Sequence, residues 1–335
     1  MQSLPVPKIE LHVHLEGTVR PKALLRIACR NRVDLPAQNE QDLAQLYRFR
    51  DFTHFLELWL MTTSAIQTHR DFQEVVVTYA EEAASHGAVY IEGIFTPAER
   101  VGGGASWDEV FSGFCDGAEE AKELFGVEVR LTPDTPRNCD LETAMKTARY
   151  AINYRERGVV GLGIGGPEAT HPPEPFEQAF RLAKDEGLGS VPHAGEAAGP
   201  ASIWGAIDVL HADRIRHGIR AVEDQELLRE LAARSIVCDV CPVSNLRTKV
   251  VESIERHPLA EMTEAGVLCS ISTDDPAMFD TDLATDYDMA ARLGCSPDRA
   301  FLAGLTGALC DAKTRSWLQS IHESFPWFDD AHQRG

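Results

Sequence analysis

The sequence has no apolar run of membrane-spanning length, which would need about 20 residues, and no run of basic residues. Its first eight residues, MQSLPVPK, also lack the apolar core of a signal peptide. The net charge of −20 would repel nucleic acid and anionic membranes at long range, and no basic patch offsets it. We therefore expect a cytoplasmic protein whose partner is neither a nucleic acid nor a membrane.

Cysteine is also sparse, and the chain has no obvious linker. Eight cysteines in 335 residues are too few and too irregularly spaced for a disulfide scaffold. Cys238 and Cys241 form a C-x-x-C pattern, but residues three apart on a strand face opposite sides. We expect both to be packing residues. No segment rich in proline, glycine or serine divides the chain, so the sequence predicts one domain over residues 1–335.

Short apolar runs alternate with longer segments of helical periodicity, a pattern typical of a parallel sheet with crossover helices. The runs cover residues 9–14, 88–95, 127–132, 159–165, 190–193, 214–217, 236–241 and 267–273. Eight such units predict a (β/α)8 barrel of the TIM type. An open, doubly wound sheet is the alternative arrangement of the same elements.

The interval between the first two predicted strands is too long for one crossover helix. It contains separate helical patterns over residues 21–30, 52–68 and 71–85. We interpret residues 20–86 as a helical insertion that covers part of the barrel mouth. The tail from Pro297 onward also has helical periodicity.

Polar side chains gather at the predicted carboxyl ends of the strands, where barrels of this kind place their catalytic groups. His12 and His14 end the first strand and share a face because alternate strand residues point to the same side. Later strand ends carry His193, Glu196, His217, Asp274 and Asp275. Each alone is typical of a structural histidine, a loop carboxylate or a turn. Their common rim favours a functional site.

The residue types at this rim suit a zinc site with separate acid and base groups. Neutral imidazole nitrogens and a carboxylate oxygen can hold Zn²⁺ and leave a position open for water. Glu196, beyond a glycine, is the candidate proton donor, and His217 is the candidate group that orients the water or accepts its proton. The candidate ligands are His12, His14, His193 and Asp274.

In chain order, HVHLEG (12–17), HAGE (193–196), HG (217–218), CPVSN (241–245) and STDDP (272–276) resemble the adenosine deaminase family of metal-dependent amidohydrolases. The resemblance covers nearly the whole chain. It implies one Zn²⁺ per chain on the four ligands, and hydroxide attack on carbon 6 of a 6-aminopurine nucleoside with loss of ammonia. It also implies that Glu196 protonates N1, that Asp275 contacts N7 and that the Gly166 backbone contacts N3.

One departure from the family bears on the substrate. Family members that act on adenosine commonly carry Asp, near the ribose 5′ end, where this chain has Glu16. Residues 198–204 and 245–248 also resemble the branch of aminodeoxyfutalosine deaminases of menaquinone biosynthesis through futalosine, and this resemblance implies a 5′-modified adenosine as substrate. Adenosine deamination in purine salvage is the alternative.

A helical face after the first strand is the candidate cover of the substrate. In similar enzymes such a helix presents apolar side chains over the purine and ribose. Packing against the barrel would give the same pattern, so this role stays open beside a structural one. The side chains concerned are Phe52, Phe55, Leu56 and Trp59.

Competing functions fit the sequence less well. Barrel hydrolases with two metals often use a carboxylated lysine from the fourth strand, and residues 159–166 contain no lysine. The glycines of the same segment do not indicate a dinucleotide site, because Pro167 interrupts the helix that should follow. A barrel that binds nucleosides without turnover is the non-enzymatic alternative. The joint presence of acid, base and ligands argues against it.

Overall fold

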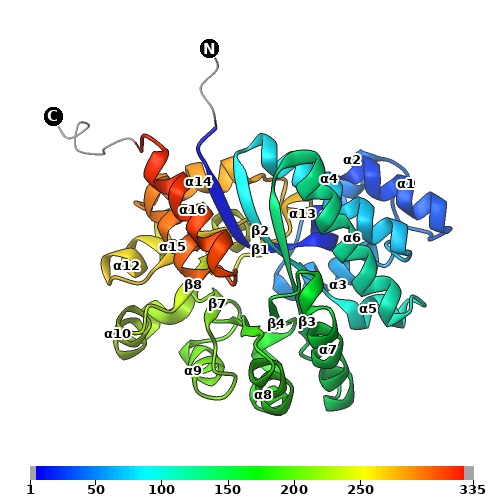
Figure 1. The fold of residues 1–335 in the computed structure, drawn as a ribbon. Coiled ribbons are helices and arrows are strands. Elements are labelled where there is room, and N and C mark those ends of the chain that lie inside the picture. The colour runs from blue at the N-terminus through cyan, green and yellow to red at the C-terminus, as the bar shows by residue number, and fades with distance from the viewer. Residues whose placement is uncertain (1–4, 328–335) are drawn as a thin grey trace.

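A ring of parallel strands lies at the centre of the computed structural model, which describes residues 5–327 (Figure 1). Neighbouring strands pair in the order β1-β2-β3-β4-β5 and β6-β7-β8-β9. The strands are β1 (Lys8–His14), β2 (Ala88–Phe95), β3 (Glu128–Pro136), β4 (Gly161–Gly165), β5 (Gly189–Ser190), β6 (His193–Ala194), β7 (Arg214–His217), β8 (Val237–Val240) and β9 (Cys269–Ile271).

The predicted fifth strand is present as two short pieces. β5 pairs with β4, and β6 pairs with β7, on either side of Val191 and Pro192. Proline has no backbone N–H and so cannot donate to a ladder, although the Pro192 carbonyl still accepts from Arg216 N at 2.9 Å. Because β5 and β6 follow one another along a single position, the nine labelled strands fill eight places in the ring.

The ring closes between its first and last strands. Just beyond β9, Asp274 forms a parallel bridge with Val13 of β1. The His14 N–H donates to the Asp274 carbonyl at 2.7 Å, and the Asp274 N–H donates to the His12 carbonyl at 3.0 Å. The predicted (β/α)8 barrel is therefore confirmed, and the open sheet is excluded.

Helices surround the ring (Figure 1). Those after β2 are α5 (Pro97–Gly102), α6 (Trp107–Phe125), α7 (Leu141–Asn153), α8 (Glu177–Asp185), α9 (Pro200–Asp208), α10 (Gln225–Ala233), α11 (Pro242–Arg247), α12 (Leu259–Glu264), α13 (Pro276–Phe279), α14 (Leu283–Arg292), α15 (Pro297–Gly307) and α16 (Ala312–Ser324). Short 3-10 turns are η1 (Leu15–Thr18), η2 (Arg155–Arg157), η3 (Glu168–Thr170), η4 (Glu174–Phe176), η5 (Ile219–Glu223) and η6 (Ile254–Arg256). Within the described residues, no helix has both the length and the apolar character needed to cross a membrane.

The segment between β1 and β2 holds four helices: α1 (Pro21–Asn31), α2 (Glu40–Leu46), α3 (Phe52–Thr63) and α4 (His69–Ser85). The helix predicted over residues 52–68 ends earlier, at Thr63. Thr68 lies outside it and caps the start of α4 in a reciprocal pair with Asp71. α2 was not expected and is capped by Asn39. α4 packs against α6 and β2, as a crossover helix does.

The barrel interior contains buried ion pairs as well as apolar side chains. Arg214 of β7 is fully buried and bonds Glu92 Oε2 at 2.7 Å and Asp239 Oδ2 at 2.6 Å. One step nearer the carboxyl ends of the strands, Arg216 pairs with Asp134 of β3. Buried charges are tolerated when they are paired and hydrogen-bonded. The Arg216–Asp134 pair forms the floor of the site described next.

Candidate active site

Four side chains from three barrel strands meet at the carboxyl end of the ring. His14 Nε2 and His12 Nε2 each lie 3.1 Å from His193 Nε2. Asp274 Oδ1 lies 3.2 Å from His12 Nε2 and 3.3 Å from His14 Nε2. All four donor atoms lie within 4.8 Å of one another. Residues that the sequence spreads along the whole chain are thus brought to one point.

This donor set fits a divalent cation such as Zn²⁺. Zinc–nitrogen bonds of about 2.0–2.1 Å in a tetrahedron place neighbouring ligand atoms about 3.3 Å apart, close to the separations above. Burial lowers the pKa of His14 to about 3 and also lowers that of His193, so both rings are neutral and can offer a lone pair. The pKa of Asp274 is held well below its usual range, because the adjacent imidazoles, His12 first, outweigh the effect of burial.

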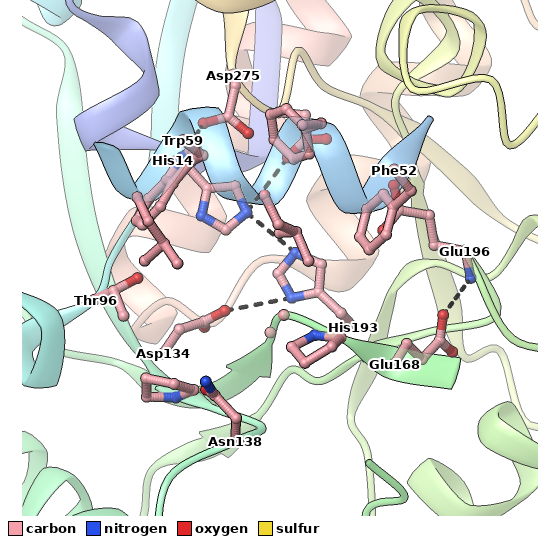
Figure 2. A pocket seen from close by; sticks show the side chains of 18 of the residues that line it. His14, Phe52, Trp59, Thr96, Asp134, Asn138, Glu168, His193, Glu196 and Asp275 are labelled. Carbon is pink, nitrogen blue, oxygen red and sulfur yellow. Dashed lines mark hydrogen bonds and ion pairs between the residues drawn. The ribbon is translucent and has the colours of Figure 1, made fainter. Parts of the chain in front are cut away.

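A second layer of contacts orients two of these donors. His193 Nδ1 lies 2.9 Å from the Ile164 carbonyl, which only accepts, so Nδ1 carries the proton and Nε2 is left for an ion. Asp134 Oδ2 lies 3.3 Å from the same nitrogen (Figure 2). On the other side, the Ser244 hydroxyl donates to Asp274 Oδ2 at 2.6 Å.

The sequence did not indicate Asp134 as a residue of the site. The position of its carboxylate beside His193 depends on Gly163 of β4. A Cβ at Gly163 would lie 2.0 Å from Asp134 Oδ1, so a side chain on β4 would collide with the carboxylate. The sequence does show an Asp in the third strand region, followed by Gly163 in the fourth. Nothing in the strand pattern indicates that the Asp134 carboxylate occupies the space that a side chain at Gly163 would fill.

Glu196 and His217 lie beside the donor group, and both are buried. Glu196 Oε2 lies 3.5 Å from His217 Nε2. Burial, together with the charges of Asp274 and Glu168, raises the pKa of Glu196 well above its usual range. Burial and the nearby His12 lower the pKa of His217 well below its usual range. Burial therefore favours the protonated form of the Glu196 carboxyl group and the neutral form of the His217 imidazole.

A chain of directed hydrogen bonds fixes which nitrogen of His217 carries the proton. The Leu259 N–H donates to His257 Nδ1 at 3.2 Å, so His257 carries its proton on Nε2 and donates to Asn245 Oδ1 at 3.2 Å. The Asn245 amide then faces His217 Nδ1 at 3.3 Å with its NH2 group. The remaining proton of His217 is thus on Nε2, which faces Glu196. The sequence motif included Asn245, but no pattern indicated His257.

A cavity of about 820 Å³, including its open mouth, lies above these groups. Its lining includes most of the residues expected at the site, namely His14, Phe52, Phe55, Leu56, Trp59, Gly166, His193, Glu196, His217, Asp274 and Asp275. The expected contact Glu16 is not among the lining residues. Its Oε1 accepts from the N–H of Thr96, which does line the cavity, at 2.8 Å. Glu16 therefore supports the wall from behind.

Helix α3 is tied to the site through Asp275. The Trp59 indole N–H donates to Asp275 Oδ1 at 2.7 Å (Figure 2). Burial and the neighbouring Asp274 raise the pKa of Asp275 well above its usual range. A Cβ at Gly17 would lie 1.8 Å from Asp275 Oδ1, so this position accepts only glycine.

The two cysteines of the C-x-x-C pattern are both buried. Cys238 lies in the apolar core around the barrel. Cys241 does more than fill space, because its Sγ lies 3.6 Å from His12 Nδ1 and so contacts a candidate ligand. The separation along the strand nevertheless places only Cys241 beside the site.

The closed barrel, its polar rim and the convergent donors define a hydrolase of the metal-dependent amidohydrolase kind. The family model described as adenosine deaminase matches residues 7–320, and the chain belongs to the adenosine deaminase family, whose enzymes hydrolyse carbon–nitrogen bonds. The chain is 50% identical to an aminodeoxyfutalosine deaminase of Acidothermus cellulolyticus, over 96% of this chain and 92% of that protein.

Solved structures agree with this assignment. An adenine deaminase from Arthrobacter aurescens superposes with a TM-score of 0.90 at 28% identity, covering 95% of this chain and 98% of that chain. An amidohydrolase from Burkholderia ambifaria, with bound Zn, gives a TM-score of 0.86 at 27% identity, covering 95% and 90% of the two chains. Both likenesses extend over nearly the whole barrel.

Proposed function

We propose that this protein is a zinc-dependent deaminase that converts a 6-aminopurine nucleoside with an enlarged 5′ group into its 6-oxo product and ammonia. The observation that carries the proposal is the convergence of three imidazole nitrogens and one carboxylate oxygen beside Glu196, whose pKa burial raises. Aminodeoxyfutalosine is the proposed substrate, because the relative that shares half of the residues bears that name.

His12, His14, His193 and Asp274 would hold one Zn²⁺ per chain, and the ion would supply an activated water for attack on carbon 6. Glu196 holds the proton that N1 receives as the ring nitrogen gains charge. His217, with its proton fixed on Nε2, donates a hydrogen bond toward the space between Glu196 and Asp274 and so orients the attacking water.

The remaining lining residues bind and orient the purine in this proposal. Asp275 faces N7, and the Gly166 backbone, held at a φ of 106°, faces N3. Phe52, Phe55 and Leu56 of α3 cover the rings and exclude water. Glu16 acts indirectly by fixing Thr96 in the wall near the ribose.

Side-by-side kinetics test the substrate. We expect kcat/KM for aminodeoxyfutalosine to exceed the values for adenosine, adenine and 5′-methylthioadenosine, measured by the loss of the 6-aminopurine absorbance and the release of ammonia. An equal or higher kcat/KM for adenosine would replace this assignment with purine salvage. Absence of turnover of all four compounds by the zinc-loaded protein would reject deamination itself.

Metal removal tests the cofactor. We expect elemental analysis to find about one zinc per chain, since four donors in one cluster complete a single site. Dialysis against a chelator should abolish turnover, and added Zn²⁺ should restore it. Two tightly held zinc ions per chain, or full activity after chelation, would contradict the proposed site.

A further inference from the structure

The loop that carries Glu196 is held by one buried carboxylate from another part of the barrel. Glu168, at the start of η3 after β4, is 5% exposed. Its Oε1 accepts the Gly195 N–H at 2.5 Å. Its Oε2 accepts the Glu196 N–H at 3.1 Å (Figure 2). The same oxygen accepts the N–H groups of Ala197 and Ala198 at 2.7 and 2.9 Å. Four consecutive backbone donors therefore converge on a single side chain.

These four N–H groups do not belong to a helix or strand, since the segment lies between the end of β6 and the start of α9. Gly195 has a φ of 71°, a left-handed conformation that suits glycine and turns successive N–H groups toward one side. Consecutive N–H groups arranged in this way form a concave anion-binding site. Here the anion is a side chain of the protein itself.

The position of this carboxylate links three parts of the site. Glu168 lines the cavity. It follows Gly166, the proposed purine contact, by two residues. The segment that it holds continues directly from His193, a candidate metal ligand. A displacement of this loop would therefore move the candidate acid relative to both the ion and the purine.

We propose that Glu168 is a positioning residue, which fixes the backbone of Glu196 so that its carboxyl group points at the reacting ring. This inference rests on the proposed deamination, in which Glu196 supplies the proton to N1. Charge-assisted hydrogen bonds are stronger than neutral ones, and four of them act on one short loop. A general acid misplaced by about 1 Å loses most of its effect.

The variants Glu168→Gln and Glu168→Ala test the inference, and Glu174→Gln on the same connection is the matched control because Glu174 is exposed. In Glu168→Gln the amide oxygen can still accept from residues 196–198, but its NH2 group must face the Gly195 N–H, which also donates. We expect kcat to fall at least tenfold while KM changes less than threefold. Glu174→Gln should stay within twofold of the wild type in both.

Hydrogen–deuterium exchange of the zinc-loaded protein supplies a readout that does not depend on activity. The amides of residues 195–198 should be protected in the wild type. The Gly195 amide should exchange at least tenfold faster in Glu168→Gln, and all four should do so in Glu168→Ala, with melting temperature and zinc content retained. Fast exchange of these amides in the wild type, or unchanged exchange and kcat in both Glu168 variants, would overturn the inference.

The two proposals fail in different ways. If the wild type deaminates none of the nucleosides, the proposed function is wrong, while the exchange data still decide whether Glu168 holds the loop. If the wild type is active and Glu168→Ala keeps its kcat despite faster exchange, the loop is held but its position does not matter for proton transfer. That result would reject Glu168 as a positioning residue.

Discussion

A carboxylic acid donates a proton at neutral pH only when its surroundings disfavour the ionised form. Glu196 meets this condition because it is buried and lies near the negative charges of Asp274 and Glu168. The pKa values of these two neighbouring carboxyl groups are thus shifted in opposite directions, that of Glu196 upward by burial and that of Asp274 downward by its imidazole partners. Such divergence within one cluster is typical of acid–base catalysis.

Glu196→Gln tests the acid directly. The amide keeps the size of the side chain but has no acidic proton, so we expect kcat to fall by about 10³-fold, within the range of general acid catalysis. Zinc content and the affinity for the 6-oxo product should stay close to wild-type values, as measured by elemental analysis and calorimetry. Wild-type turnover in this variant would show that another group protonates N1.

His257 predicts a specific dependence of stability on pH. Burial lowers the pKa of His257 from 6.5 to about 4. Between these two pH values the unfolded chain binds a proton at this residue and the folded chain does not. Folding stability is therefore lost as pH falls from 6.5 to 4, by up to about 3 kcal/mol for this group. Above pH 6.5, His257 is neutral in both the folded and the unfolded chain, so it does not lower the folding stability there.

The variant His257→Gln removes that titration. In urea unfolding at pH 7, 5.5 and 4, the free energy of unfolding of the variant should improve relative to the wild type as pH falls. A difference that is the same at all three pH values would contradict the assignment of a buried, neutral His257.

At the residue scale, the sequence predicts the side chains that end strands, because carboxyl ends of parallel strands meet at one rim. It does not predict Asp134 or His257. Asp134 reaches His193 only because β4 leaves a gap at Gly163, and His257 acts through Asn245 from a segment far from any strand end. Both depend on packing between segments that the local pattern does not describe.

The elements of the fold follow from periodicity where caps and strand ends are clear. The structure agrees with seven of the eight predicted strands as single elements, and the fifth is divided around Pro192. Helix α2 was missed because its seven residues give too short a pattern to stand out. The division between α3 and α4 was predicted, but α3 ends at Thr63 rather than at Thr68, and Thr68 instead caps the start of α4.

Helix α3 is connected to the site by one hydrogen bond, which gives a test at this scale. In Trp59→Phe the ring packing remains, but Asp275 loses its indole donor in a buried place. Loss of such a partner costs about 1–3 kcal/mol, so we expect kcat/KM to fall about tenfold or more.

Trp317→Phe on α16 is the matched control, since Trp317 is 38% exposed. The control should leave kcat/KM and KM unchanged. An equal loss in both variants would indicate a general effect on stability, and no loss in Trp59→Phe would show that α3 does not help to orient Asp275.

Across the whole molecule, acidic residues outnumber basic ones. The residues that line the cavity show the same excess of acidic side chains. Among the described residues that line it, none is Lys or Arg, whereas Glu99, Asp134, Glu168, Glu196, Asp274 and Asp275 all contribute carboxyl groups. A phosphate at the ribose 5′ position would enter this acidic lining without a cationic partner. Unfavourable charge pairing of this kind costs several kcal/mol.

Adenosine 5′-monophosphate should therefore be a poor substrate. We expect its kcat/KM to be at least 100-fold below that of adenosine, with the difference decreasing as salt screens the charges. Kinetics at low and high ionic strength check both statements. Comparable values for the two compounds would show that a cation from outside the lining neutralises the phosphate.

The closure of the barrel has a consequence for how the protein matures. The backbone bonds that join β1 to the segment after β9 involve His12, His14 and Asp274, the same residues that would hold the ion. The segment around Asp274 must leave the ribosome before it can pair with His12 and His14. Zinc uptake during synthesis would thus report that this segment has emerged, and translation products that stop before Asp274 would stay metal-free.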